Sequence, residues 1–200
     1  MTAGAPALGT FVLRTVLLLP PCFAAWYFSA PYHATVAGAL AVLMVDLFRP
    51  GIVTALERSG TDLVFVTTLE VNPSPGQAAV LVPEVDPLLY TFGLGFFLAL
   101  MLASRVRWWK ILAGAALLLP FQSWGIALDF LTQVAIRLGP GIRAQTGLSG
   151  WRVEAIALGY QVGTLILPTL VPVVLWAISS RGFIESLLRS RAPDAAALPR

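Results

Sequence analysis

Four long uncharged apolar runs constrain this sequence more than any other feature. They are Thr15–Ala30, Leu88–Ser104, Ile111–Leu128 and Ala155–Ser180, and each is about 16 residues or longer. A helix needs about 20 apolar residues to cross the ~30 Å hydrocarbon core of a bilayer. Because 58% of the residues are hydrophobic and only 12% are charged, the chain has too little polar surface to cover a soluble globule. The sequence therefore predicts an all-α integral membrane protein, built as a single membrane domain over residues 1–200.

Four transmembrane helices are expected once the helix ends are placed at charged residues, prolines and aromatic side chains. Their ranges are about 10–30, 87–104, 108–132 and 153–180. Pro31 is expected to end the first helix, because a proline removes a backbone hydrogen bond. Residues 34–58 hold a shorter apolar stretch interrupted by Asp46 and Arg49, which is typical of an outer interfacial or re-entrant helix. Whether residues 34–48 cross the membrane as a fifth span stays open.

Residues 62–86 change from helical to strand periodicity. Alternate positions from Leu63 to Val71 form a pattern rich in β-branched residues, which is typical of a strand. The segment Asn72–Gly76 is a turn signal, and Ala79–Val82 is a second short strand. We expect a small β-hairpin outside the bilayer, since open strand edges cannot face lipid.

The Lys and Arg residues are unevenly distributed between the two ends of the predicted helices. Arg14, the turn 105–110 and the tail 181–200 together hold eight of the 13 basic residues and two of the 10 acidic ones. Because segments rich in Lys and Arg remain in the cytoplasm, both termini are expected there. The hairpin 62–86 and the loop 133–152 are then periplasmic. The basic amphipathic part of the tail is expected to lie on anionic lipid.

The sequence carries no signature of enzymatic or nucleic-acid chemistry. Its single cysteine, Cys22, precedes its single histidine, His33, by eleven residues, or roughly 16 Å along a helix. Cys22 is therefore interpreted as a packing residue and His33 as an interfacial turn residue. The basic residues form no run that alternates with aromatic residues, which argues against nucleic-acid binding. No catalytic residue, cofactor or metal site is expected.

Polar side chains inside the predicted spans are the candidate site residues. Gln122 and Gln161 lie at similar depths, about 12–15 Å from the outer helix ends, and are expected to hydrogen bond each other across antiparallel helices. Asp129 and Glu154 are similarly matched nearer the outer surface. The side chain that neutralises them would be Arg137 or Arg152. These groups either form interhelical hydrogen bonds, which we favour, or line a substrate-facing pocket.

Two prolines interrupt the last predicted span. Pro168 and Pro172 are four residues apart, so they share one helix face and leave two gaps in the backbone hydrogen bonds. Neighbouring hydroxyls such as that of Thr164 can satisfy the freed groups. A fixed kink is favoured over a hinge.

Four sequence segments carry a resemblance to a known family. They are Val85–Gly93, Phe121–Gly125, Ala157–Gln161 and Leu167–Trp176. With these segments the chain resembles, from about Arg14 to Leu188, the small membrane proteins found with exosortase H. Exosortase H belongs to a bacterial system that processes proteins bearing a C-terminal sorting tail. The resemblance covers the overall pattern and includes no catalytic signature.

The resemblance implies a partner protein rather than a processing enzyme. Exosortases look like cysteine-dependent transpeptidases with the cysteine on the outer side of the membrane, whereas the only cysteine here is Cys22 in the first helix. We therefore expect a non-catalytic accessory protein that partners an exosortase-type sorting enzyme in the bacterial inner membrane. Its expected docking surface is the outer hairpin together with the loop 133–152. The alternative is a small transporter or lipid-handling protein that uses the region of Gln122 and Gln161.

Overall fold

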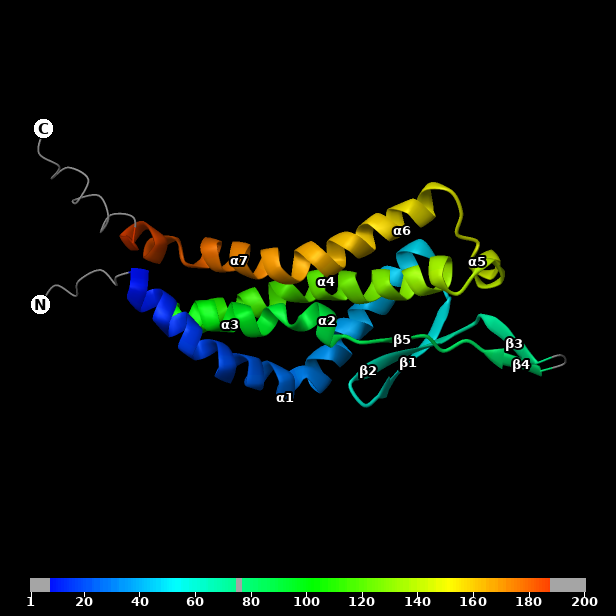
Figure 1. Ribbon diagram of the computed structural model, residues 1–200, viewed down its shortest axis with the longest axis horizontal. Coiled ribbons are helices and arrows are strands. Elements are labelled where there is room, and N and C mark those ends of the chain that lie inside the picture. The colour runs from blue at the N-terminus through cyan, green and yellow to red at the C-terminus, as the bar shows by residue number, and fades with distance from the viewer. Residues whose placement is uncertain (1–7, 75–76, 188–200) are drawn as a thin grey trace, which may run out of the picture.

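The computed structural model describes residues 8–74 and 77–187, and most of these residues are helical. The helices form a bundle elongated along one axis, with the strands at one end (Figure 1). The chain passes along this axis four times. In order, the passes are α1 (Leu8–Phe48), α2 (Leu88–Thr91) with α3 (Gly93–Ala103), α4 (Trp108–Thr132) with the π-helix η1 (Gln133–Arg137), and α6 (Trp151–Gln161) with the π-helix η2 (Val162–Ile166) and α7 (Leu167–Ser179). The short helix α5 (Pro140–Thr146) lies between the third and fourth passes.

Three of these helices are long and apolar enough to cross a membrane. They are Leu8–Phe48, Trp108–Arg137 and Trp151–Ser179. The remaining pass, Leu88–Ala103, is the second along the chain; it is apolar but shorter, and its helical rise of about 24 Å falls below the ~30 Å hydrocarbon thickness. The predicted mostly helical membrane protein is confirmed, whereas the number of spans stays a prediction.

Helix α1 does not end at Pro31 as the sequence analysis predicts. It runs for 41 residues and contains Pro20, Pro21 and Pro31, and it is visibly bent (Figure 1). A proline removes one hydrogen bond and bends a helix, but packing against neighbouring elements can hold the two halves together. Ala37 and Ala41, in the second half of α1, are fully buried in the main core. This packing explains why the helix continues past Pro31.

The predicted interfacial helix over 34–58 is also wrong. Residues 34–48 continue α1, and Val53–Ser59 forms the strand β1, which pairs with the antiparallel strand β2 (Asp62–Thr67). The two strands are joined by a tight turn in which Gly60 has φ +64°, a backbone conformation that favours glycine. The local helical pattern is weak, and pairing with a neighbouring strand overrides it.

The strand region is larger than the predicted hairpin over 62–86. The strand β5 (Glu84–Val85) pairs with β2 to give a three-stranded antiparallel sheet of order β1-β2-β5. A separate hairpin consists of β3 (Glu70–Ser74) and β4 (Gln77–Val80). The turn predicted at Asn72–Gly76 does connect two paired strands, although residues 75–76 lie outside the described part.

The sheet packs on the helices through the buried face of β2. Leu63, Phe65 and Thr67 are buried and alternate with partly exposed residues, which confirms the predicted strand periodicity. The ring of Phe65 stacks on Phe130 of α4, with the centroids 4.7 Å apart. One core therefore joins the sheet, the second half of α1 and the end of α4.

The first and last described segments lie at the end of the bundle opposite the sheet. The ring of Phe11 is 5.5 Å from that of Trp176 and 5.1 Å from that of Phe183. Lys110, in the first turn of α4, donates through its Nζ to the Ser179 carbonyl at 3.0 Å. The basic turn 105–110 and the described part of the tail therefore share one end of the bundle. Residues 188–200 of the predicted tail lie outside the described residues.

Candidate functional site

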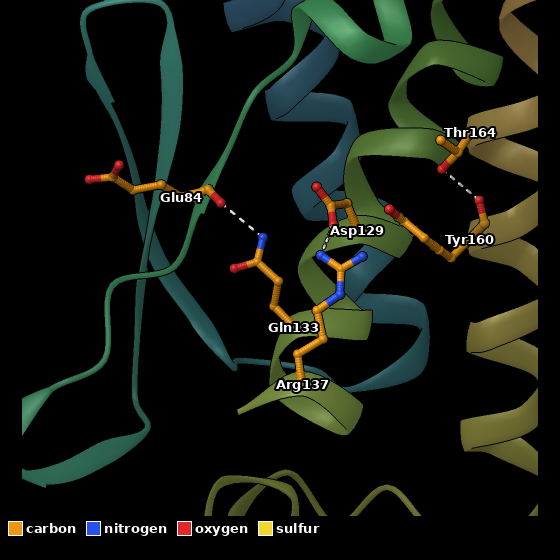
Figure 2. Close-up of polar contacts among 6 residues, drawn as sticks. All are labelled: Glu84, Asp129, Gln133, Arg137, Tyr160 and Thr164. Atoms are coloured by element: carbon orange, nitrogen blue, oxygen red, sulfur yellow. Dashed lines mark hydrogen bonds and ion pairs between the residues drawn. The ribbon is translucent and has the colours of Figure 1, made fainter. Parts of the chain in front are cut away.

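A polar cluster lies at the sheet end of the bundle, where α4 continues into η1. Arg137 Nη1 donates to Asp129 Oδ1 at 3.4 Å, and the guanidinium is 5.0 Å from the centroid of the Tyr160 ring. Figure 2 shows Arg137 reaching back along its own helix toward Asp129. The Asp129 side chain is 10% exposed and that of Arg137 is 50% exposed. Of the two candidates for neutralising Asp129, Arg137 is therefore the one that does so.

The π-helical segment η1 explains why these two side chains meet. Eight residues separate Asp129 from Arg137, and in a regular α-helix of 3.6 residues per turn they would point about 80° apart. The wider turn of a π-helix rotates each residue by a smaller angle, so η1 brings Arg137 back over Asp129. Such irregular turns are common at functional sites.

The same cluster ties three elements together. Gln133 Nε2 donates to the Glu84 carbonyl of β5 at 2.8 Å, and Thr164 Oγ1 donates to the Tyr160 carbonyl at 2.8 Å (Figure 2). Arg137 links α4 to α6 through Asp129 and Tyr160. The arrangement holds the sheet, α4 and α6 in fixed relative positions.

Gln122 belongs to a second polar network, in the middle of the bundle. His33 Nε2 donates to Gln122 Oε1 at 2.7 Å, and Gln122 Nε2 donates to the Thr91 carbonyl at 3.4 Å. The Thr91 hydroxyl accepts a hydrogen bond from Trp26 Nε1 at 3.3 Å. The network therefore joins α1, α2 and α4. Sequence reasoning missed His33 because it ended the first helix at Pro31, and continuing that helix would have placed His33 within the bundle.

The predicted hydrogen bond between Gln122 and Gln161 is wrong. Gln161 lies on the exposed face of the α6–η2–α7 helix, and it forms no side-chain hydrogen bond with any residue that the structure describes. Its neighbours on that face are Leu158 and Leu165, which are 64% and 71% exposed. The Gln161 amide is therefore exposed on an apolar helix surface.

An apolar groove opens beside this face. Its volume is about 330 Å³. Its lining residues come from α1, α4, η2 and α7 and are Met44, Pro120, Phe121, Trp124, Val162 and Leu167. Val162 directly follows Gln161 in the chain, so the groove and the exposed amide are adjacent. The two features can engage one and the same partner.

Glu154 lies away from the pair formed by Asp129 and Arg137. It is exposed, and it lines a separate surface cavity together with Arg143 and Ser149. Arg152 is also exposed. The predicted matching of Asp129 with Glu154 is thus replaced by the ion pair within α4 and η1.

Pro168 and Pro172 are both buried and belong to α7, which directly follows the π-helix η2. Pro172 has no N–H to donate to the Pro168 carbonyl, and that carbonyl lies against Gly93 of α3. A Cβ atom added to Gly93 would collide with it. The structure thus shows a close contact between α7 and α3, and both the fixed kink favoured from the sequence and the hinge stay predictions.

Cys22 is buried within α1, where a free thiol packs as a small apolar group. Among the described residues, no three or more His, Cys, Asp or Glu side chains lie close enough together to hold a metal ion.

The family model of the exosortase H-associated membrane protein matches residues 5–183. The chain belongs to this family. No curated protein and no solved structure matches the chain. Three segments that carry the resemblance contain residues of the polar contacts described above, namely Thr91, Gln122 and Tyr160. One of these segments also ends at the exposed Gln161.

Proposed function

We propose that this protein is a non-catalytic accessory subunit that binds a membrane-embedded exosortase in the bacterial inner membrane. Membership of the exosortase H-associated family supports the identity of the partner. The chain passes four times along the bundle, and the basic turn and the described part of the tail lie at one end. This arrangement supports four spans with both termini in the cytoplasm and with the sheet and the loop 133–152 in the periplasm.

The exposed amide of Gln161 carries the proposal. It lies about ten residues into a 29-residue apolar helix, or about 15 Å from the start of that helix. A polar group without a hydrogen-bond partner costs several kcal/mol in hydrocarbon. Glutamine side chains hydrogen bond across helices in membranes. We therefore assign the face formed by Leu158, Gln161 and Leu165 to a transmembrane helix of the exosortase, with the adjacent groove receiving one of its apolar side chains.

The sheet and the loop 133–152 are proposed as a second contact, outside the bilayer. The amide of Gln145 in α5 exchanges two hydrogen bonds with the backbone of Glu70 in β3, both at 2.9 Å. These bonds fix the loop against the β3–β4 hairpin, and together they form one continuous surface.

The alternative function as a transporter requires Gln122 and Gln161 in one polar site. Gln122 instead forms hydrogen bonds with His33 and Thr91 inside the bundle.

A photo-cross-linking experiment tests the assigned face. The full chain carrying a photoreactive phenylalanine at Leu158 or Leu165 is co-expressed with an exosortase H, and membranes are irradiated before purification. Both positions should give an adduct with the exosortase. The same residue at Leu17, which is exposed on α1, serves as the matched control and should give none. An adduct with a second copy of this chain, or no exosortase adduct at either position, would refute the assignment.

The contribution of the amide itself is measured with Gln161→Leu. Interhelical hydrogen bonds in membranes average about 0.6 kcal/mol and reach about 1.7 kcal/mol, which corresponds to an affinity loss of about three- to twentyfold. Thr169→Val on the same exposed helix surface is the control, because the Thr169 hydroxyl donates to the Ile166 carbonyl of its own helix at 3.2 Å. Equal complex yields for Gln161→Leu and wild type would show that the amide has no role in binding.

A further inference from the structure

A cavity of about 320 Å³ lies at the end of the bundle opposite the sheet, where the turn between α3 and α4 meets the end of α7. Three basic side chains line it, those of Arg105, Arg107 and Lys110. Arg105 has φ +52°, a left-handed conformation that is uncommon for residues other than glycine and that concentrates at functional sites. The tight reversal of the chain at Arg105 brings the three cations to one cavity.

Within residues 8–74 and 77–187, no acidic side chain lines this cavity. Among these described residues Arg105, Arg107 and Lys110 form no ion pair, and the pair between Asp129 and Arg137 lies at the other end of the bundle. Lys110 Nζ donates to the Ser179 carbonyl and lies 5.8 Å from the centroid of the Trp109 ring. Two further N–H donors of the Lys110 ammonium and both guanidinium groups remain for a ligand.

A buried hydroxyl in the same cavity has no partner. Ser180 is 3% exposed, and its Oγ forms no hydrogen bond within the described residues. Ser104, which also lines the cavity, differs because its Oγ donates to the Leu100 carbonyl and accepts from Trp176 Nε1. A buried hydroxyl without a partner lowers stability. A hydrogen bond to a ligand oxygen in the cavity would remove this loss.

The position of the cavity identifies the source of that oxygen. Trp108 and Trp109 begin α4 at this site and are both exposed. Exposed tryptophans at a helix end lie at the headgroup level of a bilayer. Basic pockets between membrane helices bind anionic lipid headgroups. We propose that this cavity binds the phosphate of an anionic phospholipid, held by Arg105, Arg107 and Lys110 and by a hydrogen bond from the Ser180 hydroxyl. This site is independent of the exosortase partner.

Native mass spectrometry of the purified full-length protein tests the proposal, with phosphatidylglycerol, phosphatidylcholine or inorganic phosphate added to the detergent solution. Phosphatidylglycerol should remain bound, whereas phosphatidylcholine and inorganic phosphate should not. Each basic side chain near a membrane surface contributes about 1 kcal/mol, so Arg105→Gln/Arg107→Gln should weaken phosphatidylglycerol binding by about 30-fold. Arg143→Gln/Arg152→Gln, with the same charge loss at the sheet end, should leave it unchanged.

Two single variants separate binding from folding. Arg105→Gly removes one charge and also suits the left-handed backbone, so the melting temperature without lipid should be unchanged or higher while phosphatidylglycerol binding falls about fivefold. Ser180→Ala should also weaken binding, while the lipid-free protein becomes more stable because the substitution removes a buried hydroxyl without a partner. Equal retention of phosphatidylcholine and phosphatidylglycerol would overturn the proposal. So would equal loss of binding in the Arg143→Gln/Arg152→Gln control. Tight binding of inorganic phosphate alone would instead assign the site to a soluble anion.

Discussion

The contact between His33 and Gln122 gives the most direct test of the path of α1. His33→Leu leaves Gln122 Oε1 without its 2.7 Å hydrogen bond in a side chain that is 4% exposed, and an unpaired buried acceptor costs about 1–3 kcal/mol. Gln122→Leu leaves His33 Nε2 unpaired and should cost a similar amount. In His33→Leu/Gln122→Leu neither group is left unpaired, so the loss should be smaller than the sum of the single losses. We expect a coupling energy of about 0.6–1.7 kcal/mol, the range of intramembrane hydrogen bonds.

The free energies of unfolding are measured by equilibrium denaturation in mild detergent micelles, as a double-mutant cycle. Gln161→Leu combined with His33→Leu is the matched control, because it makes the same chemical change at an exposed amide. That pair should be additive within about 0.5 kcal/mol. Suppose that the losses in free energy of unfolding were additive for His33 and Gln122 but coupled for the control pair. This result would show that α1 does not continue past Pro31 along α4.

Three further changes test the packing of the bundle. Phe65→Ala removes a fully buried ring stacked on α4 and should lower the free energy of unfolding by about 3–5 kcal/mol, whereas Phe28→Ala on a ring that is 77% exposed should change it by less than about 0.5 kcal/mol; denaturation in micelles measures both. Gly93→Ala should lower the thermal melting temperature and separate α7 from α3, because the added Cβ meets the Pro168 carbonyl, and a rise in melting temperature would contradict the close contact. Cys22→Ala should leave exosortase-dependent sorting intact with only a modest loss of stability, since the thiol packs as an apolar group, and lost sorting at normal protein levels would reveal a chemical role.

The membrane class and the positions of most helices follow from composition and periodicity, but the ends of α1 do not. Pro31 predicts a helix end because the lack of a backbone N–H in proline is evident from the sequence alone. The packing that carries α1 past it involves Ala37 and Ala41 against a sheet and a helix distant in sequence. The same reason explains β1, where a helical pattern over residues 52–58 gives way to pairing with β2. Local signals place the elements, and contacts between distant elements decide where they end.

The polar residues show a second limit of prediction from sequence. Their positions along the helices can be predicted, but the directions of their side chains cannot. Asp129 and Arg137 meet only because η1 changes the rotation per residue, and nothing in the sequence around Gln133 indicates a π-helix. The sequence therefore predicts Arg137 only as one of two candidates for neutralising Asp129, and it does not predict how the two side chains meet. The same holds for Pro168 and Pro172. Their spacing predicts a kink, whereas the contact of the Pro168 carbonyl with Gly93 is known only from the structure.

Gln122 and Gln161 illustrate how the structure changes a functional argument. By sequence depth the two amides look like partners, and if they were, the bundle would be satisfied internally and would give no reason to seek another chain. The structure pairs Gln122 with His33, which leaves Gln161 alone on an apolar face. Because hydrocarbon penalises an unpaired amide, the exposure of Gln161 supports the proposed contact with another chain. The wrong prediction that α1 ends at Pro31 left His33 out of the bundle and paired Gln122 with Gln161. The exposed Gln161 amide, which most favours a membrane-embedded partner, was therefore not predicted.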